Sequence, residues 1–154
     1  MTGSDQDSAP LPPALDEIAD DFAALTAPDR LQLLLDFSRG LPGLPPHYAE
    51  HPELLEPVPE CQSPIFVATE VDGTGPQAPV TLFFQAPAEA PTTRGFAGIL
   101  ADGLQGMTAA EVLAVPDDLS HRLSLGEAVS PLRLRGMAGM LGRIKRQVRT
   151  KAGL

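Results

Sequence analysis

The strongest nucleophile in this sequence is its single cysteine, Cys61. It lies in a polar segment bracketed by prolines, Pro59–Pro64 (PECQSP), between a long proline-rich stretch and a segment typical of a strand. That position places the thiol at a loop tip or a strand start, where functional residues are often found. A lone cysteine is otherwise most often a buried and inert small hydrophobe. The sequence is therefore compatible with an exposed thiol and with a buried one.

One thiol is enough for a sulfur-transfer reaction. Its thiolate attacks the outer sulfur of a partner's persulfide and becomes a persulfide itself, a step related to thiol–disulfide exchange. A second cysteine is not needed, and its absence protects the stored sulfur from attack by a neighbouring thiol. The reaction requires a mobile loop that reaches the donor, a sheltered place for the loaded sulfur, and a cation or backbone amide that favours the anion.

The cysteine count also excludes other chemistry. One cysteine forms no internal disulfide and no multi-cysteine zinc or iron–sulfur site within one chain. Three histidines remain as possible metal ligands, namely His47, His51 and His121. Two of them are four residues apart, a helical spacing, but the prolines around them make a helix improbable there. We therefore expect no metal site.

Composition and charge set the broad class. A chain of 154 residues, 43 % of them apolar, fits one domain whose core needs no disulfide. The net charge of −9 argues against general nucleic-acid binding. No apolar run approaches the roughly 18 residues that a membrane span needs, and Met1–Pro10 lacks the features of a signal peptide. We therefore expect a cytoplasmic protein that binds neither nucleic acid nor membrane.

Apolar residues at helical spacing predict most of the elements that would position Cys61. Residues 1–13 are expected to form a disordered tail and residues 14–152 a single domain. Five helices are expected before the last one, over residues 15–25, 26–40, 93–104, 108–115 and 117–125. The predicted N-caps are Thr26, Thr108 with Glu111 as a capping box, and Asp117 or Asp118. The buried side of the second helix is expected to carry Leu31, Leu34 and Leu35.

Two strands, Ile65–Val71 and Val80–Gln85, are predicted around a hairpin loop. The second strand is apolar on both faces, so we expect it to be covered on both sides. Residues 41–60 hold six prolines, which makes a regular helix or a central strand improbable there. Such a long irregular stretch is usually functional or disordered. The order of elements predicts an α+β fold in which a small antiparallel sheet of about three strands packs against N-terminal and C-terminal helices.

The last helix is predicted from apolar residues at spacings of 3, 4, 3 and 4, from Leu134 to Val148. Its other sides are basic: seven of the 11 basic residues lie in 133–151, whereas 12 of the 20 acidic residues lie in 1–60. This asymmetry has two interpretations, a solvated helix face or a docking surface for an acidic partner. On the second interpretation, the partner-binding residues are Arg135, Arg143 and Arg146.

Four segments, in order, resemble motifs of the SufE family. Glu60–Pro64 followed by a strand resembles the family's Cys-Gln-Ser loop, and Ala86–Gly95 (APAEAPTTRG) resembles its small-acidic-Ala segment leading into a helix. Met107–Glu111 (MTAAE) resembles its Thr-initiated short helix. Ser130–Met137 (SPLRLRGM) resembles its Ser/Thr-Pro-x-Arg-x-x-Gly entry to the last helix. The resemblance runs from about residue 15 to residue 152.

The resemblance implies a SufE/NifU-like fold and a sulfur-acceptor function. Cys61 would receive sulfur from a SufS-like cysteine desulfurase, stimulate that enzyme, and pass the sulfur to a SufBCD-like scaffold that builds iron–sulfur clusters. The pyridoxal phosphate belongs to the desulfurase, so no cofactor is expected in this chain. The residues that carry over to the surroundings of the persulfide are Glu60, Gln62, Ser63, Glu89 and Arg133.

Two positions depart from the family's pattern. Glu89 stands where many members have Asp, which retains the charge on a longer side chain. Glu60 stands where the family often has Gly; this loses glycine's freedom at positive φ and adds a negative charge that tends to raise the pKa of the thiol.

Two other functions remain as alternatives. A one-cysteine redox enzyme needs a low-pKa thiol beside a cation or a helix N-terminus, and the sequence shows neither next to Cys61. A non-catalytic module would use the basic C-terminal helix to bind an acidic partner. Gln62 and Ser63 have a simpler interpretation as residues that cap the turn or strand.

Overall fold

A computed structural model describes residues 10–154; residues 1–9, most of the predicted tail, lie outside the described residues. The longer helices are α2 (Pro13–Ala23), α3 (Ala27–Arg39), α5 (Pro91–Gly103) and α8 (Pro131–Ala152). The shorter helices are α4 (Pro46–Ala49), α6 (Ala109–Leu113) and α7 (Leu119–Arg122), with single 3-10 turns at η1 (Pro52–Leu54), η2 (Pro59–Cys61) and η3 (Leu125–Glu127). The strands are β1 (Glu56–Pro57), β2 (Phe66–Val71) and β3 (Val80–Gln85).

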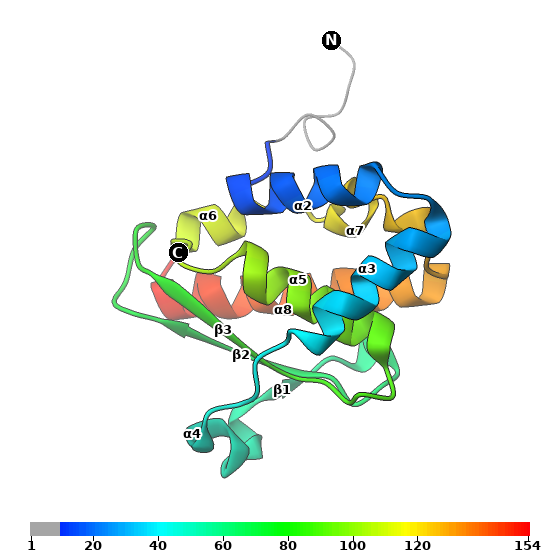
Figure 1. Ribbon diagram of the computed structural model, residues 1–154. Coiled ribbons are helices and arrows are strands. Elements are labelled where there is room, and N and C mark those ends of the chain that lie inside the picture. The colour runs from blue at the N-terminus through cyan, green and yellow to red at the C-terminus, as the bar shows by residue number, and fades with distance from the viewer. Residues whose placement is uncertain (1–9) are drawn as a thin grey trace.

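The three strands form one antiparallel sheet in the order β1–β2–β3 (Figure 1), which confirms the predicted α+β fold. β2 and β3 pair along their whole length, with Val67 opposite Phe84. On its other side Val67 pairs with Glu56 of β1. Side chains alternate across a strand, so Val67 and Phe84 enter the main core, whereas Phe83 lies on the opposite face.

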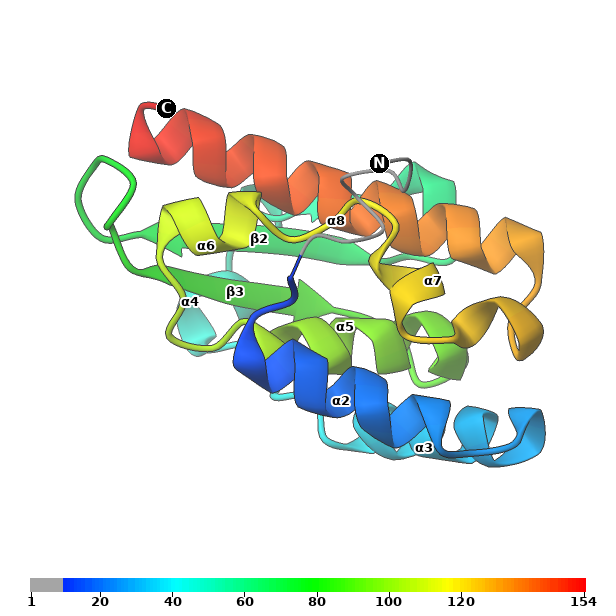
Figure 2. The same cartoon turned by 90° about the horizontal axis from the view of Figure 1, so that it is seen from above.

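Helices cover the core face of the sheet. α8 contacts β2 and α5 contacts β3, while α2 and α3 pack against α5 on the side away from the sheet (Figure 2). Phe22, Phe96, Ile99 and Met137 are at most 1 % exposed. Burial of one such side chain stabilises a fold by roughly 1.5–3 kcal/mol, so this packing fixes α8, the helix against which Cys61 lies.

α3 and α5 approach each other closely because α5 carries glycines where the two helices meet. A Cβ on Gly95 would lie 2.3 Å from the carbonyl oxygen of Leu34, and one on Gly98 would lie 2.3 Å from that of Phe37. Arg94 donates to one backbone carbonyl in α3 and to another just after β3. The pair Arg94–Gly95 therefore joins α5 to its neighbours.

The first two helices differ in part from the prediction. α2 ends at Ala23, so Leu25 is partly buried beyond the helix. On α3, Leu34 is fully buried, but Leu31 is 36 % exposed, because the close contact with α5 buries only a narrow strip of the helix. Thr26 occupies the predicted N-cap, yet its side chain makes no capping hydrogen bond.

The short helices after α5 lie where they were expected. α6 begins with the predicted capping box, in which Thr108 and Glu111 each accept a hydrogen bond from the other's backbone N–H. α7 ends at Arg122 and not at 125, because Ser124 adopts a left-handed conformation (φ 60°) that interrupts the helix. Asp118 stands at the N-cap of α7 without a capping hydrogen bond.

The proline-rich segment 41–60 is more regular than expected. It contains α4, two 3-10 turns and the edge strand β1. Pro46 opens α4 at a position where the missing N–H removes no helical hydrogen bond, and Pro57 is tolerated because β1 is an edge strand. The prediction against a helix was therefore wrong for residues 46–49, although His51 lies outside that helix.

This segment covers the second face of the sheet. The rings of Tyr48 and Phe83 have centroids 4.8 Å apart, and the Tyr48 hydroxyl donates to Glu70 (2.9 Å). Leu55 is buried in the same small cluster. The predicted covering of β3 on both sides is confirmed at Phe83, whereas Thr81 on the same face is exposed.

α8 is the longest helix, with 22 residues, and its predicted apolar side is buried from Met137 to Val148. The hydroxyl of Ser130 caps it by accepting the backbone N–H of Arg133 (3.3 Å). Gly153 ends it in a left-handed conformation (φ 74°). Across residues 10–154, neither α8 nor any other helix combines the length and the apolar character that crossing a membrane would require.

Candidate functional site

Cys61 closes η2, a single turn that lies against α8. We call residues 59–63 the cysteine loop. The chain reverses at Gln62, whose backbone is left-handed (φ 60°), before it enters β2. The Cys61 thiol is partly buried and donates to the backbone carbonyl of Gly136 in α8 (Sγ–O 3.4 Å). The thiol is thus sheltered by the last helix without being fully enclosed.

Two glycines of α8 make room for the cysteine loop. Gly136, Gly139 and Arg143 follow one another at spacings of three and four, so they share one side of the helix. A Cβ on Gly136 would lie 3.0 Å from the Cα of Cys61 and 3.2 Å from its Sγ. A Cβ on Gly139 would lie 2.8 Å from the Cβ and Cγ of Glu60. A larger residue at Gly139 would therefore displace the loop.

A charged cluster fastens the loop at the residue before the cysteine. Arg143 donates to both carboxylate oxygens of Glu60 (Nε–Oε1 3.0 Å, Nη2–Oε2 2.9 Å) and to Glu56 (Nη1–Oε2 2.7 Å). Glu56 also accepts from Arg146 and Gln147. The side chains of Arg143 and Glu60 are 28 % and 35 % exposed. The bidentate ion pair between Arg143 and Glu60 is therefore a strong, charge-assisted interaction that is partly shielded from water.

The same neighbours keep Cys61 in its thiol form. Burial raises the pKa of Cys61 to about 11; the carboxylate of Glu60 adds to the rise and the guanidinium of Arg143 opposes it. Hydrogen bonds from Arg143 lower the pKa of Glu60, which stays charged. The carbonyl oxygen of Gly136 favours an S–H donor over a thiolate. The closed site therefore shelters a sulfur atom without activating it.

Gln62 and Ser63 shape the turn through their backbone groups. The Gln62 N–H donates to the carbonyl of Pro59 (3.1 Å), and the Ser63 carbonyl accepts from the N–H of Ile65 (2.7 Å). The positive φ of the loop falls at Gln62 and not at Glu60. Replacing the family's frequent glycine by Glu60 therefore requires no strained backbone at that position.

The other predicted site residues make different contacts. Arg133 donates to the hydroxyl of Thr92 (3.0 Å), which joins the first turn of α8 to that of α5. Glu89 is exposed in the turn before α5. Arg135 is exposed and lines a shallow pocket with His121. The structure thus brings Glu60 and Arg143 together beside Cys61 and joins Arg146 to them through Glu56, whereas Arg133 is engaged with α5.

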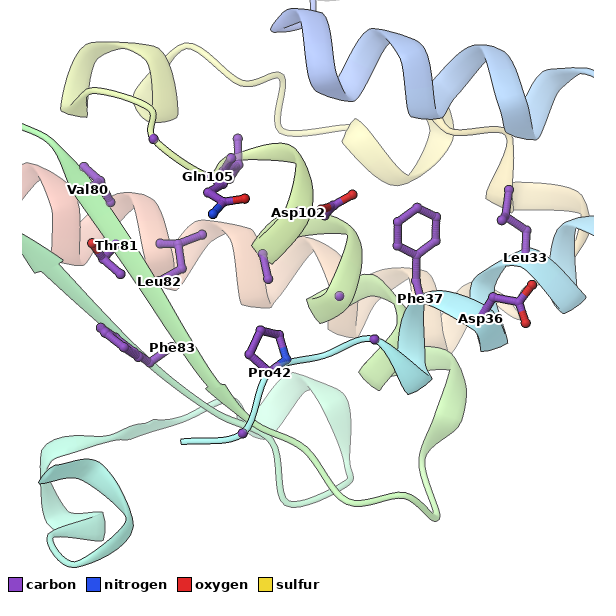
Figure 3. A pocket seen from close by; sticks show the side chains of 16 residues that line it. Leu33, Asp36, Phe37, Pro42, Val80, Thr81, Leu82, Phe83, Asp102 and Gln105 are labelled. Atoms are coloured by element: carbon purple, nitrogen blue, oxygen red, sulfur yellow. The ribbon is translucent and has the colours of Figure 1, made fainter. Parts of the chain in front are cut away.

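A separate pocket lies in another part of the molecule. Its volume is 660 Å³, and the end of α3, residues 40–43, β3 and the end of α5 enclose it (Figure 3). Leu33, Phe37 and Leu82 contribute to a mostly apolar wall, and the carboxylates of Asp36 and Asp102 are its acidic groups. No predicted site residue lines it. The cysteine loop, which holds the nucleophile, is the better candidate site.

Sequence reasoning missed the cation beside the cysteine. The sequence analysis groups Arg143 with a partner-binding surface, yet Arg143 pairs with Glu60, 83 positions earlier in the chain. No local pattern indicates a contact between residues so far apart. One signal was present: Gly136, Gly139 and Arg143 mark a side of α8 with little side-chain bulk and a charge at its end, which suits a closely packed loop.

The fold and the site define a small α+β protein with one thiol on a loop that lies against its last helix. The sequence matches the SufE family, described as an Fe-S metabolism associated domain, over residues 16–148. The chain therefore belongs to the SufE family, which confirms the predicted resemblance.

Relatives agree with this assignment. The chain is 55 % identical over 141 residues to uncharacterized SufE-like proteins of two Mycobacterium tuberculosis strains, covering 92 % of this chain and 95 % of each relative. It is 26 % identical over 132 residues to SufE-like protein 1, chloroplastic/mitochondrial, of Arabidopsis thaliana, covering 85 % of this chain and 33 % of that protein. The solution structure of a hypothetical protein from Thermus thermophilus superposes with a TM-score of 0.78 at 38 % identity, covering 94 % of this chain and all of that one.

Proposed function

We propose that this protein is a sulfur acceptor: Cys61 takes a persulfide sulfur from a SufS-like cysteine desulfurase and relays it to a SufBCD-like scaffold. The observation that carries this proposal is the partly buried thiol on a loop seated against α8. Membership of a family associated with Fe-S metabolism supports it. We place the protein in the cytoplasm, where a single thiol remains reduced.

The transfer step needs no external oxidant. The Cys61 thiolate attacks the outer sulfur of the desulfurase persulfide, a new S–S bond forms at Cys61, and the old S–S bond breaks as the desulfurase cysteine leaves as a thiolate. Delivery to the scaffold repeats the exchange with Cys61 as the leaving group. The loop geometry suits storage between these steps, because α8 shelters the thiol on one side.

Two alternatives receive less support. A peroxidase-like thiol needs a depressed pKa, whereas the pKa of Cys61 is raised to about 11 despite the nearby Arg143. A binding module based on the basic helix would use free charges, but Arg143 and Arg146 are already paired with glutamates of this chain.

The proposal is tested by cysteine-dependent sulfide release from the matching desulfurase, with wild-type protein and with Cys61→Ser. We expect several-fold stimulation by the wild type and none by the variant. Intact mass of the wild type should then show a gain of about 32 Da, one sulfur atom on Cys61. Equal stimulation by both proteins, with no adduct, would refute the acceptor role.

A further inference from the structure

The cysteine loop is attached to α8 at two adjacent residues. Cys61 is held by one thiol–carbonyl contact of 3.4 Å. Glu60 is held more strongly, by two charge-assisted hydrogen bonds to Arg143 of 2.9 and 3.0 Å and by close contact with Gly139. Because charge-assisted bonds are roughly twice as strong as neutral ones, the attachment depends mainly on Glu60.

The attached loop opposes reaction at Cys61. The sulfur faces a carbonyl oxygen, and its side chain is partly buried against the helix. A thiolate in this place would lose hydration and face a partial negative charge, so the nucleophile forms far more readily once the loop has left α8. Since Glu60 precedes Cys61 directly, the thiol cannot move far from the helix while Glu60 stays bound.

We propose that Arg143 is a positioning residue for Cys61: with Glu60 it forms a latch that holds the cysteine loop closed on α8, and sulfur is accepted after this pair separates. The existence of the closed state does not depend on the proposed function. The role of the latch in sulfur transfer does rest on that proposed function. Glu56 makes the latch reversible. In the closed structure it already lies 2.7 Å from Arg143, so release of Glu60 would leave the partly buried guanidinium with a carboxylate partner and not as an uncompensated charge, which would be costly.

The test is alkylation of Cys61 by iodoacetamide at pH 8, without desulfurase, followed by intact mass. With Arg143→Gln we expect alkylation to become at least about tenfold faster; full exposure, which returns the pKa from about 11 to about 8.5, would give roughly 200-fold. If Arg143 acted only through its charge, Arg143→Gln would slow alkylation, because the guanidinium favours the thiolate. Arg149→Gln, the same charge change on an exposed residue of α8, should leave the rate unchanged.

A second pair of variants opens the latch without touching its charges. Gly139→Ala places a Cβ 2.8 Å from Glu60, whereas Gly142→Ala meets nothing within 4 Å. Both increase helix propensity, so neither should weaken α8. We expect faster alkylation with Gly139→Ala and the wild-type rate with Gly142→Ala, which keeps the proposal testable if Arg143→Gln folds poorly.

Low concentrations of urea separate local opening from global unfolding. Opening of the loop exposes little surface, so the accelerated rate should depend only weakly on urea, whereas unfolding would depend on it steeply. Unchanged or slower alkylation in both Arg143→Gln and Gly139→Ala would overturn the latch, as would a steep dependence on urea. None of these outcomes bears on sulfur acceptance, which the desulfurase assay decides separately.

Discussion

The reactivity of Cys61 is set by the groups around its sulfur more than by the thiol itself. Burial and Glu60 favour the protonated form, and Arg143, although close, is largely committed to Glu60 and Glu56. At pH 8 a pKa of about 11 leaves about one thiol in a thousand ionised, compared with roughly a quarter of an ordinary cysteine. The closed site therefore keeps the Cys61 sulfur in its protonated, unreactive form.

This state predicts an unusual pH dependence. Because the folded-state pKa of Cys61 lies at about 11, the rate of its alkylation should rise about tenfold per pH unit from pH 8 to pH 10. The measurement is the iodoacetamide rate across this range by intact mass. In urea, where the chain is unfolded, the same thiol should level off near pH 9. A plateau near pH 9 in the folded protein as well would contradict a closed, protonated thiol.

At the scale of elements, glycines determine where helices and loops come into contact. Gly98 places α5 against α3, and Gly139 places α8 against the cysteine loop. The first contact involves backbone on both sides, whereas the second involves a side chain on a loop. The first is therefore a contact on which stability depends, and the second is one on which the site depends.

Gly98→Ala should destabilise the fold. Its new Cβ would lie 2.3 Å from the carbonyl oxygen of Phe37, so the helices must separate, at a cost of about 1–3 kcal/mol in the free energy of unfolding. Urea unfolding followed by circular dichroism measures this. Gly142→Ala serves as the control, since it meets no neighbour and should stabilise by about 0.5–1 kcal/mol. Equal effects of the two variants would show that α3 and α5 can separate without cost.

Elements with a clear local signal were predicted well. Periodic apolar residues predicted α5 and α8, two runs rich in β-formers predicted β2 and β3, and the capping box at Thr108 predicted the start of α6. The short elements of segment 41–60 were not predicted, because contacts such as that of Tyr48 with Phe83 stabilise them. Such a contact depends on the finished sheet, and no residue pattern within the segment indicates it.

Sequence reasoning pointed to Cys61 as the candidate nucleophile but not to the residues that hold its loop against α8. Cys61 stood out by its chemistry and its loop context, and Glu60 was expected to raise the pKa of the thiol, as it does. Arg143 was not connected with either, because it was read only as part of the basic surface of the last helix, although Gly136 and Gly139 on the same side of that helix marked a place where a loop could pack. A three-dimensional contact over 83 residues follows from the packing of α8 and β2 and not from the local sequence.

At the scale of the whole molecule, the uneven charge of the sequence is explained in part by contacts within the chain. The acidic N-terminal half and the basic last helix meet where Glu56 and Glu60 pair with Arg143 and Arg146. Lys145 is likewise committed, through Asp117. The charges of α8 that remain available for a partner are therefore fewer than the sequence suggested.

Arg135 is the best remaining candidate among the predicted partner-binding residues. It is exposed, it lies within one residue of Gly136 beside the cysteine loop, and none of residues 10–154 forms an ion pair with it. A charge at the rim of an interface acts mainly on the association rate and its salt dependence. Arg143, by contrast, cannot be used to test docking, because its loss also disturbs the latch.

Arg135→Glu should therefore raise the protein concentration needed for half-maximal desulfurase stimulation, by about three- to tenfold at low salt, since reversing a rim charge slows encounter. The difference from wild type should shrink as salt is added, and the alkylation rate of Cys61 should not change. Arg149→Glu makes the same charge change near the far end of α8 and should have a smaller effect. If both variants weaken stimulation equally, net charge and not a local contact at Arg135 governs docking; if neither does, Arg135 is a solvated residue and the partner approaches the cysteine loop from another side.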